Sequence, residues 1–390
     1  MNAVPSPALG RLSRRSLLAA ALVAAPATLA APALTTPAHA SARRAPTATR
    51  PLLLGTYTSA EGGGTGIGTA AYDTATGAIT PGPVITGVEN PSYLALHPSG
   101  GTVYAVAEQD AGAVTAVALA PDGTYEVLGT RPTGGSGPTH LSVHPSGRWL
   151  LSANYTSGSV AVHPIAQDGS LGERTDLVTH SSPPPGPGQN GPHAHQIVTS
   201  PDGGHVLAVD LGTDTVYTYR LDESAGTLTE VSRAALAPGS GPRHLTFHPG
   251  GRSAYLACEL DNTTVVCAYD PEPGTLTPGA GQSTGSETGY PAQLVVTGDG
   301  SYAYLANRGP NSLTRYAVED GGAALRLLDT VSAGGDWPRQ LALSPDGSLL
   351  FAANQRSSTV TAFRVGSDGA LTPAGEPLPA PVAVCVLPLP

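Results

Sequence analysis

One short segment recurs along this chain at a nearly fixed interval, and this repetition constrains the fold more than any other feature. The segment is plainest at residues 137–154, which read Gly-Pro-Thr-His-Leu-Ser-Val-His-Pro-Ser-Gly-Arg-Trp-Leu-Leu-Ser-Ala-Asn. Close copies begin at Asn90, Gly241, Tyr290 and Trp337, and a looser copy begins at Pro192. A period of this size indicates stacked or radial copies of one supersecondary unit.

Each copy is predicted to supply four β-strands. It contains an alternating apolar run, a Pro-Ser-Gly or Pro-Asp-Gly turn and a second apolar run. Alternating apolar residues bounded by turn residues are typical of strands, and Pro followed by Ser-Gly or Asp-Gly provides the backbone angles of a tight reversal. Loops such as 168–171 and 368–371 then lead from a third run to a fourth. The third runs are 159–164, 215–220, 264–269 and 359–364.

The turns set the period of the repeat. Equivalent places in successive turns are occupied by Pro98, Pro145, Pro201, Pro249, Gly298 and Pro345. The steps between them are 47, 56, 48, 49 and 47 residues by subtraction, and the longest contains a Pro- and Gly-rich insertion at 181–192. Blades of a β-propeller repeat at roughly 40–50 residues.

Six copies are complete, and the two ends of the repeat region supply a seventh. The run 380–388 resembles an opening strand with nothing after it, whereas the run 51–58 begins a unit that lacks an opening strand. The sequence therefore predicts an all-β, seven-bladed propeller of four antiparallel strands per blade over residues 51–390. Its C-terminal strand would complete the N-terminal blade, which would remove two free sheet edges.

Composition narrows the function classes. The net charge is −10, and the 19 basic residues are all arginine. The absence of lysine excludes catalysis through a lysine Schiff base, and the acidic balance argues against a nucleic-acid surface, which is usually basic.

The first forty residues resemble an export signal. Ser13-Arg14-Arg15-Ser16-Leu17-Leu18 precedes an apolar stretch, and Ala38-His39-Ala40 offers a cleavage site. The paired arginines predict a twin-arginine signal peptide at 1–40, with ordinary Sec export as the alternative. We therefore expect an extracellular or cell-envelope protein with no membrane anchor after cleavage and a flexible leader at 41–50.

The cysteines favour no metal site. Cys258 and Cys267 flank a predicted hairpin and could pair in an oxidising compartment, but buried thiols are the favoured interpretation for these two and for Cys385. No zinc-ligand spacing is present. Neither a metal nor another cofactor is expected.

Function should lie where the copies differ from one another. The opening position of the first strand holds Ser92, Thr139, His195, Arg243, Ala292 and Arg339, and the next holds Tyr93, His140, Gln196, His244, Gln293 and Gln340. The end of the second strand holds Glu108, Asn154, Asp210, Glu259, Asn307 and Asn354. Because the first strand leaves one face and the second returns to it, all three sets should converge at one end of the central channel.

These residue types suit proton transfer and anion stabilisation. Histidine exchanges a proton near neutral pH, arginine stabilises an oxyanion or holds an acid group, and glutamate orients both. We predict a functional role for His195, Arg243 and Glu259, and weigh function and structure equally for His140 and His244. A calcium site at Glu108, Asp210 and Glu259 is disfavoured because arginines share that face.

At these residues the chain resembles the bacterial seven-bladed propeller lactonases, that is, the propeller-type 6-phosphogluconolactonases and the 3-carboxymuconate-lactonising enzymes. The resemblance runs from about residue 52 to the C-terminus. It is carried by Leu54-Gly-Thr-Tyr-Thr58, Ala153-Asn-Tyr-Thr-Ser-Gly-Ser159, Gly191-Pro-His-Ala-His195, Gly241-Pro-Arg-His244, Glu259-Leu260, Asn307-Arg-Gly-Pro-Asn-Ser312, Trp337-Pro-Arg339 and Ala353-Asn-Gln355.

The resemblance implies a cofactor-free lactone hydrolase. His195 or a neighbour would activate water, Arg243 would stabilise the oxyanion or hold an acid group, and Glu259 would position them. The predicted substrate-binding residues are His140, His193, His244, Arg308 and Arg339. We expect a monomer whose partner is a small lactone.

Two features differ from the relatives. Gly188-Gln189 stands where they commonly carry Arg-Gln, and the predicted export would separate the protein from a cytoplasmic sugar phosphate. Both argue against 6-phosphogluconolactone as the natural substrate. Two alternatives stay open: a carboxymuconate cycloisomerase that forms the lactone, and a non-catalytic extracytoplasmic binding propeller.

Overall fold

The computed structural model describes residues 48–120, 123–181, 186 and 189–390. The predicted signal peptide at 1–40 and most of the leader at 41–50 lie outside the described residues. Within them, no helix is long and apolar enough to cross a membrane.

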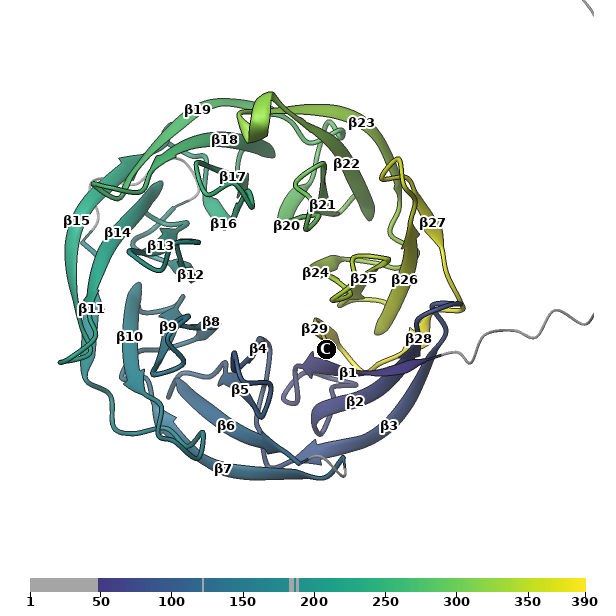
Figure 1. Ribbon diagram of the computed structural model, residues 1–390, viewed down its shortest axis with the longest axis horizontal. Helices are drawn as coiled ribbons and strands as arrows, with labels where there is room; N and C mark the ends of the chain where they lie inside the picture. Colours follow the sequence, from purple (N-terminus) through teal and green to yellow (C-terminus); the bar gives the residue numbers. More distant parts are fainter. Residues whose placement is uncertain (1–47, 121–122, 182–185, 187–188) are drawn as a thin grey trace, which may run out of the picture. The chain divides into compact units, whose positions relative to one another are not determined.

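The described chain forms seven β-sheets arranged around a central axis, so the predicted seven-bladed propeller is confirmed (Figure 1). Strands are antiparallel throughout, and those of each blade follow one another from the axis outward. Blade 1 contains β29 (Ala383–Pro388), β1 (Thr49–Thr56), β2 (Gly66–Asp73) and β3 (Ile79–Thr86). Blade 2 contains β4 (Leu94–Leu96), β5 (Thr102–Ala107), β6 (Ala113–Leu119) and β7 (Tyr125–Pro132). Blade 3 contains β8 (Pro138–Val143), β9 (Trp149–Asn154), β10 (Ser159–Pro164) and β11 (Asp176–Thr179).

The remaining four blades repeat this order. Blade 4 contains β12 (Ala194–Thr199), β13 (Val206–Asp210), β14 (Thr215–Asp222) and β15 (Thr227–Ala235). Blade 5 contains β16 (Pro242–Phe247), β17 (Ser253–Cys258), β18 (Thr263–Asp270) and β19 (Thr275–Ser283). Blade 6 contains β20 (Tyr290–Val296), β21 (Tyr302–Arg308), β22 (Ser312–Glu319), the short 3-10 helix η1 (Asp320–Gly322) and β23 (Ala324–Ser332). Blade 7 contains β24 (Pro338–Leu343), β25 (Leu349–Asn354), β26 (Thr359–Val365) and β27 (Leu371–Pro373), and a further strand, β28 (Leu378–Pro379), also pairs with β26.

The ring closes through its two ends, as predicted. β29 pairs with β1, for example Leu53 opposite Leu387, and thereby supplies the innermost strand of blade 1. β1 begins at Thr49, two residues before the predicted boundary, because Thr49 and Arg50 continue the pairing with Asp73 and Tyr72 of β2.

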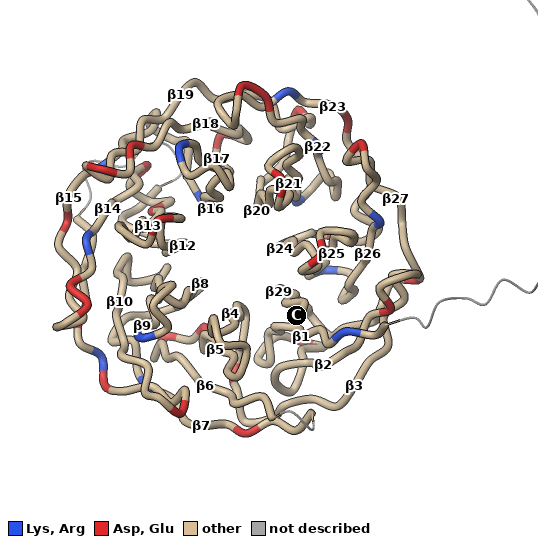
Figure 2. Tube along the Cα trace, in the orientation of Figure 1, with Lys and Arg blue, Asp and Glu red and all other residues tan. Residues whose placement is uncertain are grey.

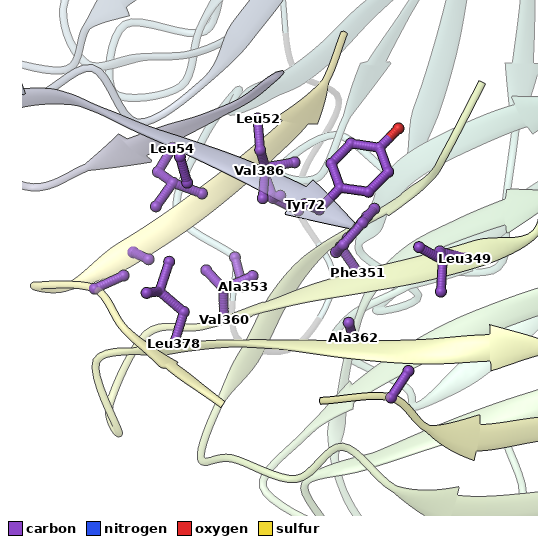
Figure 3. Close-up of a cluster of buried hydrophobic side chains, with 14 residues drawn as sticks. Leu52, Leu54, Tyr72, Leu349, Phe351, Ala353, Val360, Ala362, Leu378 and Val386 are labelled. Carbon is purple, nitrogen blue, oxygen red and sulfur yellow. The ribbon is translucent and has the colours of Figure 1, made fainter. Parts of the chain in front are cut away.

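The hydrophobic core lies between neighbouring blades. Figure 3 shows one such layer, in which Leu52 and Tyr72 of blade 1 face Leu349 and Phe351 of blade 7. The rings of Tyr72 and Phe351 meet edge to face with centroids 5.0 Å apart. The second strands of blades 3 and 7 are buried along their length, whereas the outermost strand of blade 4 is mostly exposed or half-buried.

Repeated side chains join one blade to the next. Tyr104, Tyr255 and Tyr304 each donate a hydrogen bond to the carbonyl of a turn glycine in the following blade, at 2.8–2.9 Å. His97 bonds the Gly147 carbonyl of the next blade at 2.9 Å. These contacts explain why the turn residues recur in the sequence.

The three cysteines are buried free thiols, in agreement with the favoured interpretation. Acidic and basic residues are interspersed around the ring of described residues (Figure 2).

Candidate active site

The predicted site residues lie at one end of the propeller, where the innermost strand of each blade begins and the second strand ends. Register links the two places, since Pro242 at the start of β16 pairs with Cys258 at the end of β17, as Pro138 pairs with Asn154 in blade 3. The alignment of second-strand ends predicted from sequence was therefore wrong by one residue in two blades, because Glu259 and Glu108 follow the position that Asn154 occupies. The innermost strands β4, β8, β12, β16, β20, β24 and β29 surround the axis (Figure 1). Side chains from neighbouring blades can therefore meet there.

A β-bulge sets the direction of the key side chains. The pairing skips His195 in β12, Arg243 in β16 and Arg339 in β24, and the register shifts at each of these points. A bulge inserts one residue into a strand and re-aims its side chain, and bulges are frequent beside active sites. The same irregularity in several blades brings the residues of the opening position to one end of the axis.

Glu259 is held by two arginines. Its Oε2 atom lies 3.1 Å from Arg243 Nε and 2.5 Å from Arg308 Nη2. The arginine side chains are 2% and 5% exposed, while that of Glu259 is 19% exposed. Arg243 Nη1 also donates to the Ala292 carbonyl at 2.6 Å, and Arg308 Nε donates to the Tyr290 carbonyl at 3.0 Å. This arginine–glutamate cluster is therefore fixed by blades 5 and 6 together.

The electrostatics of this cluster favour an ionised carboxylate. Burial raises the pKa of Glu259, but the charges of Arg308 and Arg243 outweigh burial, so its pKa is lowered overall. Burial is also the main cause that lowers the pKa of Arg243 well below its ordinary value, with the charge of Arg308 next. Glu259 is thus a poor proton acceptor and a good fixed negative charge.

Arg339 differs from the other two arginines. Among the described residues, no carboxylate oxygen lies within 4.0 Å of its guanidinium, which stands 5.7 Å from the ring centroid of Tyr57. Burial lowers the pKa of Arg339, but the Tyr57 phenol and the carboxylates of Glu108 and Glu259 raise it by more. Arg339 therefore stays charged and retains donors for a ligand.

Glu108 is bonded by hydroxyl groups. Its Oε2 atom accepts a hydrogen bond from the Tyr57 hydroxyl at 2.9 Å and another, shorter one from the Ser92 hydroxyl. Burial raises the pKa of Tyr57 to about 12, and the charge of Glu108 adds to this while Arg339 opposes it. The phenol is consequently protonated at neutral pH and acts as a donor.

Three imidazoles cluster beside Arg243. The ring of His244 lies 5.2 Å from that of His195 and 5.5 Å from that of His140, centroid to centroid. Burial, followed by the charge of Arg243, lowers the pKa of His140 to about 3 and the pKa of His195 and His244 well below the ordinary value. All three rings are neutral at physiological pH.

His140 occupies a position that connects blades. Its Nδ1 accepts a hydrogen bond from the Ile197 amide of the next blade at 3.5 Å. At the same position of other blades, glutamine side-chain oxygens accept amide hydrogen bonds of the same kind, from Leu245, Leu341 and Val386 to Gln196, Gln293 and Gln340. This shared contact favours the structural interpretation of His140.

His193 lies at the edge of the cluster. Its ring stacks on Tyr155 with centroids 4.5 Å apart, and Tyr155 also meets His195 edge to face at 5.6 Å. The His193 amide donates to Asp210 Oδ1 at 2.8 Å, and Asp210 Oδ2 pairs with the buried His180 at 2.5 Å. The Asp210–His180 pair thus fixes the segment that carries His193 and His195.

Four residues of this end were not among the predicted site residues. Tyr57, Tyr155 and Trp337 stand within the motifs that carry the family resemblance, and Glu108 shares its repeat position with Glu259, so each had a sequence signal. Trp337 has a φ of 64°, where two other copies of the repeat place Gly137 and Gly241. Arg308 lies 5.5 Å and Arg356 lies 3.4 Å from its ring centroid.

No group of three or more potential metal ligands occurs in the part of the chain that the structure describes. In the insertion before His193, the Gln189 side chain donates to the Leu211 carbonyl at 2.6 Å and to Asp214 at 2.8 Å. Gln189 therefore contacts the loop between β13 and β14 of blade 4.

Comparisons with known proteins agree with this architecture. Residues 51–388 match a family model described as "Lactonase, 7-bladed beta-propeller". The 6-phosphogluconolactonase of Bacillus subtilis (strain 168) is 33% identical over 290 residues, which cover 73% of this chain and 82% of that protein. The solved structure of a periplasmic gluconolactonase from Pseudomonas aeruginosa has a TM-score of 0.82 and 31% identity, covering 88% of this chain and 99% of that one. A protein from Lactobacillus plantarum has a TM-score of 0.82 and 32% identity, covering 88% and 100%.

Proposed function

Because this chain belongs to the seven-bladed β-propeller lactonase family, a family of carboxylic-ester hydrolases, we propose that it opens a sugar-type lactone to the hydroxy acid by attack of water. The relatives support this choice of substrate class. One is a 6-phosphogluconolactonase and another is a periplasmic gluconolactonase, so gluconolactone and its 6-phosphate are the two substrates to compare.

The observation that carries the proposal is the charged guanidinium of Arg339, which has no ion-pair partner among the described residues. Its donors are available for a ligand, and the negative charge of both Glu108 and Glu259 keeps it protonated. Hydrolysis of a lactone passes through a tetrahedral oxyanion, which a preorganised cation stabilises. We assign Arg339 to this role.

Arg243 was expected to hold the oxyanion, but its contacts support a different assignment. Its guanidinium is committed to Glu259 and to the Ala292 carbonyl. In our proposal, the arginine–glutamate cluster of Arg243, Arg308 and Glu259 lies beside the lactone and holds its charges in fixed positions. Glu259 keeps the positioning role that the family resemblance implied.

His195 remains a site residue in the proposal. A base must accept a proton near the working pH, and the lowered pKa of His195 disfavours proton uptake. We therefore assign its neutral imidazole to hydrogen bonding with the lactone. His193 and His244 complete the imidazole side of the site, with Tyr155 between His193 and His195.

We also propose that the protein works outside the cytoplasm. The sequence carries the features of a twin-arginine signal at 1–40, and a relative of known structure is periplasmic. Unphosphorylated gluconolactone is then the better candidate for the natural substrate, because sugar phosphates are cytoplasmic metabolites.

The test is hydrolysis of freshly prepared glucono-δ-lactone and 6-phosphoglucono-δ-lactone by the mature protein, followed through acid release. We expect turnover above the spontaneous rate, unchanged by a chelator, and a higher kcat/KM for the unphosphorylated lactone. Failure to hydrolyse either lactone would refute the proposal. Conversion of a carboxylated muconate to its lactone would then favour the cycloisomerase alternative.

A further inference from the structure

We propose that Glu108 is the general base that activates the hydrolytic water, and that Tyr57 and Ser92 hold it for this task. This inference rests on the proposed lactone hydrolysis. It adds a catalytic residue that the family resemblance did not bring to this chain.

The first observation is what Glu108 contacts at a position that varies from blade to blade. The Glu108 amide donates to the Asn90 carbonyl, as the amides of Tyr155, Glu259 and Gln355 donate to the first residue of their own copies, so these residues share its position in the repeat. Of the two glutamates at this position, Glu259 pairs with arginines. The Glu108 side chain bonds to Tyr57 of blade 1 and to Ser92 at the start of its own blade.

The second observation concerns the two carboxylate oxygens. Both hydroxyl donors contact Oε2, and no donor among the described residues contacts Oε1. No arginine nitrogen in the same residues lies within 4.0 Å of the carboxylate. Glu108 is also partly exposed. An oriented carboxylate with one oxygen that no described donor contacts suits proton abstraction from water.

The third observation is that Tyr57 lies next to both Glu108 and Arg339, the residue that we assign to the oxyanion. The Tyr57 hydroxyl lies 2.9 Å from Glu108 Oε2, and the Tyr57 ring faces the Arg339 guanidinium at 5.7 Å. Tyr57 therefore contacts both groups, the carboxylate through its hydroxyl and the guanidinium through its ring. A lactone whose carbonyl oxygen meets Arg339 would present its carbonyl carbon near water bonded to Glu108.

The remaining proton acceptors of the site are less suitable. Glu259 is neutralised by two arginines, and the three imidazoles lie beside Arg243, which opposes a second positive charge. A carboxylate without an arginine partner is therefore the group best placed to take up a proton.

The chemical step balances without a further reactant. The water oxygen bonds to the carbonyl carbon while one water proton passes to Glu108 Oε1, and the carbonyl oxygen becomes the oxyanion at Arg339. The tetrahedral intermediate then collapses, the bond between the carbonyl carbon and the ring oxygen breaks, and the ring oxygen takes the proton from Glu108. The products are the hydroxy acid and the regenerated carboxylate.

The test compares three variants of the mature protein with glucono-δ-lactone as substrate. We expect E108Q to lower kcat by about 100-fold or more, within the 10²–10⁴ range for a general base, with KM changed less than about threefold. E108A should be equally slow, and added formate should restore its kcat by about tenfold or more because formate can occupy the vacated carboxylate site. E89Q is the matched control, since Glu89 is an exposed glutamate near the same blade end whose one side-chain bond among the described residues is to Gln109.

The outcomes separate the two proposals. If the wild-type protein hydrolyses no lactone, the proposed function fails first. If the wild type is active and E108Q retains kcat within threefold, the role of Glu108 alone is overturned. A slow E108A variant that formate does not rescue also overturns it, because loss of a purely structural contact would give that result. Melting curves establish that the variants are folded. If E108Q shows no cooperative unfolding transition, the response of E108A to formate tests the role of Glu108 instead.

Discussion

Glu108 and Glu259 occupy the same position of the repeat in blades 2 and 5, yet the propeller surrounds them differently. Two arginines and no hydroxyl group contact Glu259, whereas two hydroxyl groups and no arginine contact Glu108 within the described residues. The pKa of Glu259 is lowered by the charges of Arg308 and Arg243, which oppose burial. Environment therefore gives one carboxylate a fixed charge and leaves the other available for proton transfer, as paired carboxylates in hydrolases often show.

The difference arises from the side chains of neighbouring blades. Blade 5 has Arg243 in its own bulge, and blade 6 contributes Arg308. Blade 2 has Ser92 at the corresponding place, and blade 1 contributes Tyr57. The same position of the repeat thus lies in two different environments, because the neighbouring side chains differ.

The largest effect is expected at Arg339, whose pKa is raised by the charges of both Glu108 and Glu259. R339Q removes the charge that stabilises the oxyanion and should lower kcat by about 10²–10³-fold. The unfolding temperature should change little, since Arg339 has no ion-pair partner in the described residues. Steady-state kinetics with the unphosphorylated lactone measures this effect, and R339K should recover only part of the lost rate because lysine has a different donor geometry. A full rate in R339Q would remove Arg339 from the chemistry.

A smaller loss of rate, accompanied by a loss of stability, is expected at Glu259. E259Q leaves the buried guanidinium groups of Arg243 and Arg308 without a counter-charge, which should destabilise the fold by about 1–3 kcal/mol, less than a fully buried pair would because Glu259 is partly exposed. We expect kcat/KM to fall by about 10–100-fold, since the arginine–glutamate cluster loses its negative charge but keeps both arginines. Denaturant unfolding and kinetics on the same sample check both effects.

The fold could be predicted from the sequence because apolar alternation and turn residues are local signals that recur in every blade. The common location of His195, Arg243 and Glu259 also followed, since hairpin register brings strand starts and strand ends to one edge. Other features depend on contacts between blades, which no single copy of the repeat encodes. The bond from Arg243 to Ala292 joins blades 5 and 6, and the bond from Tyr57 to Glu108 joins blades 1 and 2.

Glu259 should also affect how the stability of the protein depends on pH. The pKa of Glu259 is lowered in the folded state, so its contribution to stability is present above the ordinary value of 4.5 and is lost as the pH falls through the folded value. We therefore expect the difference in unfolding temperature between wild type and E259Q to be largest at neutral pH and to shrink below pH 4.5. A difference that stays constant from pH 7 to pH 3 would contradict an ionised Glu259.

The smallest effect is expected at His140, which was predicted from sequence to bind substrate. Gln196, Gln293 and Gln340 hold the same position and accept an amide hydrogen bond from the next blade, as His140 does. H140Q should preserve this bond, so kcat/KM should remain within about threefold of wild type and the unfolding temperature should stay within a few degrees. H140A removes the acceptor and should be the less stable of the two. If H140Q instead raises KM strongly while the protein stays folded, His140 contacts the lactone, as we propose for His244 at the same position of the repeat.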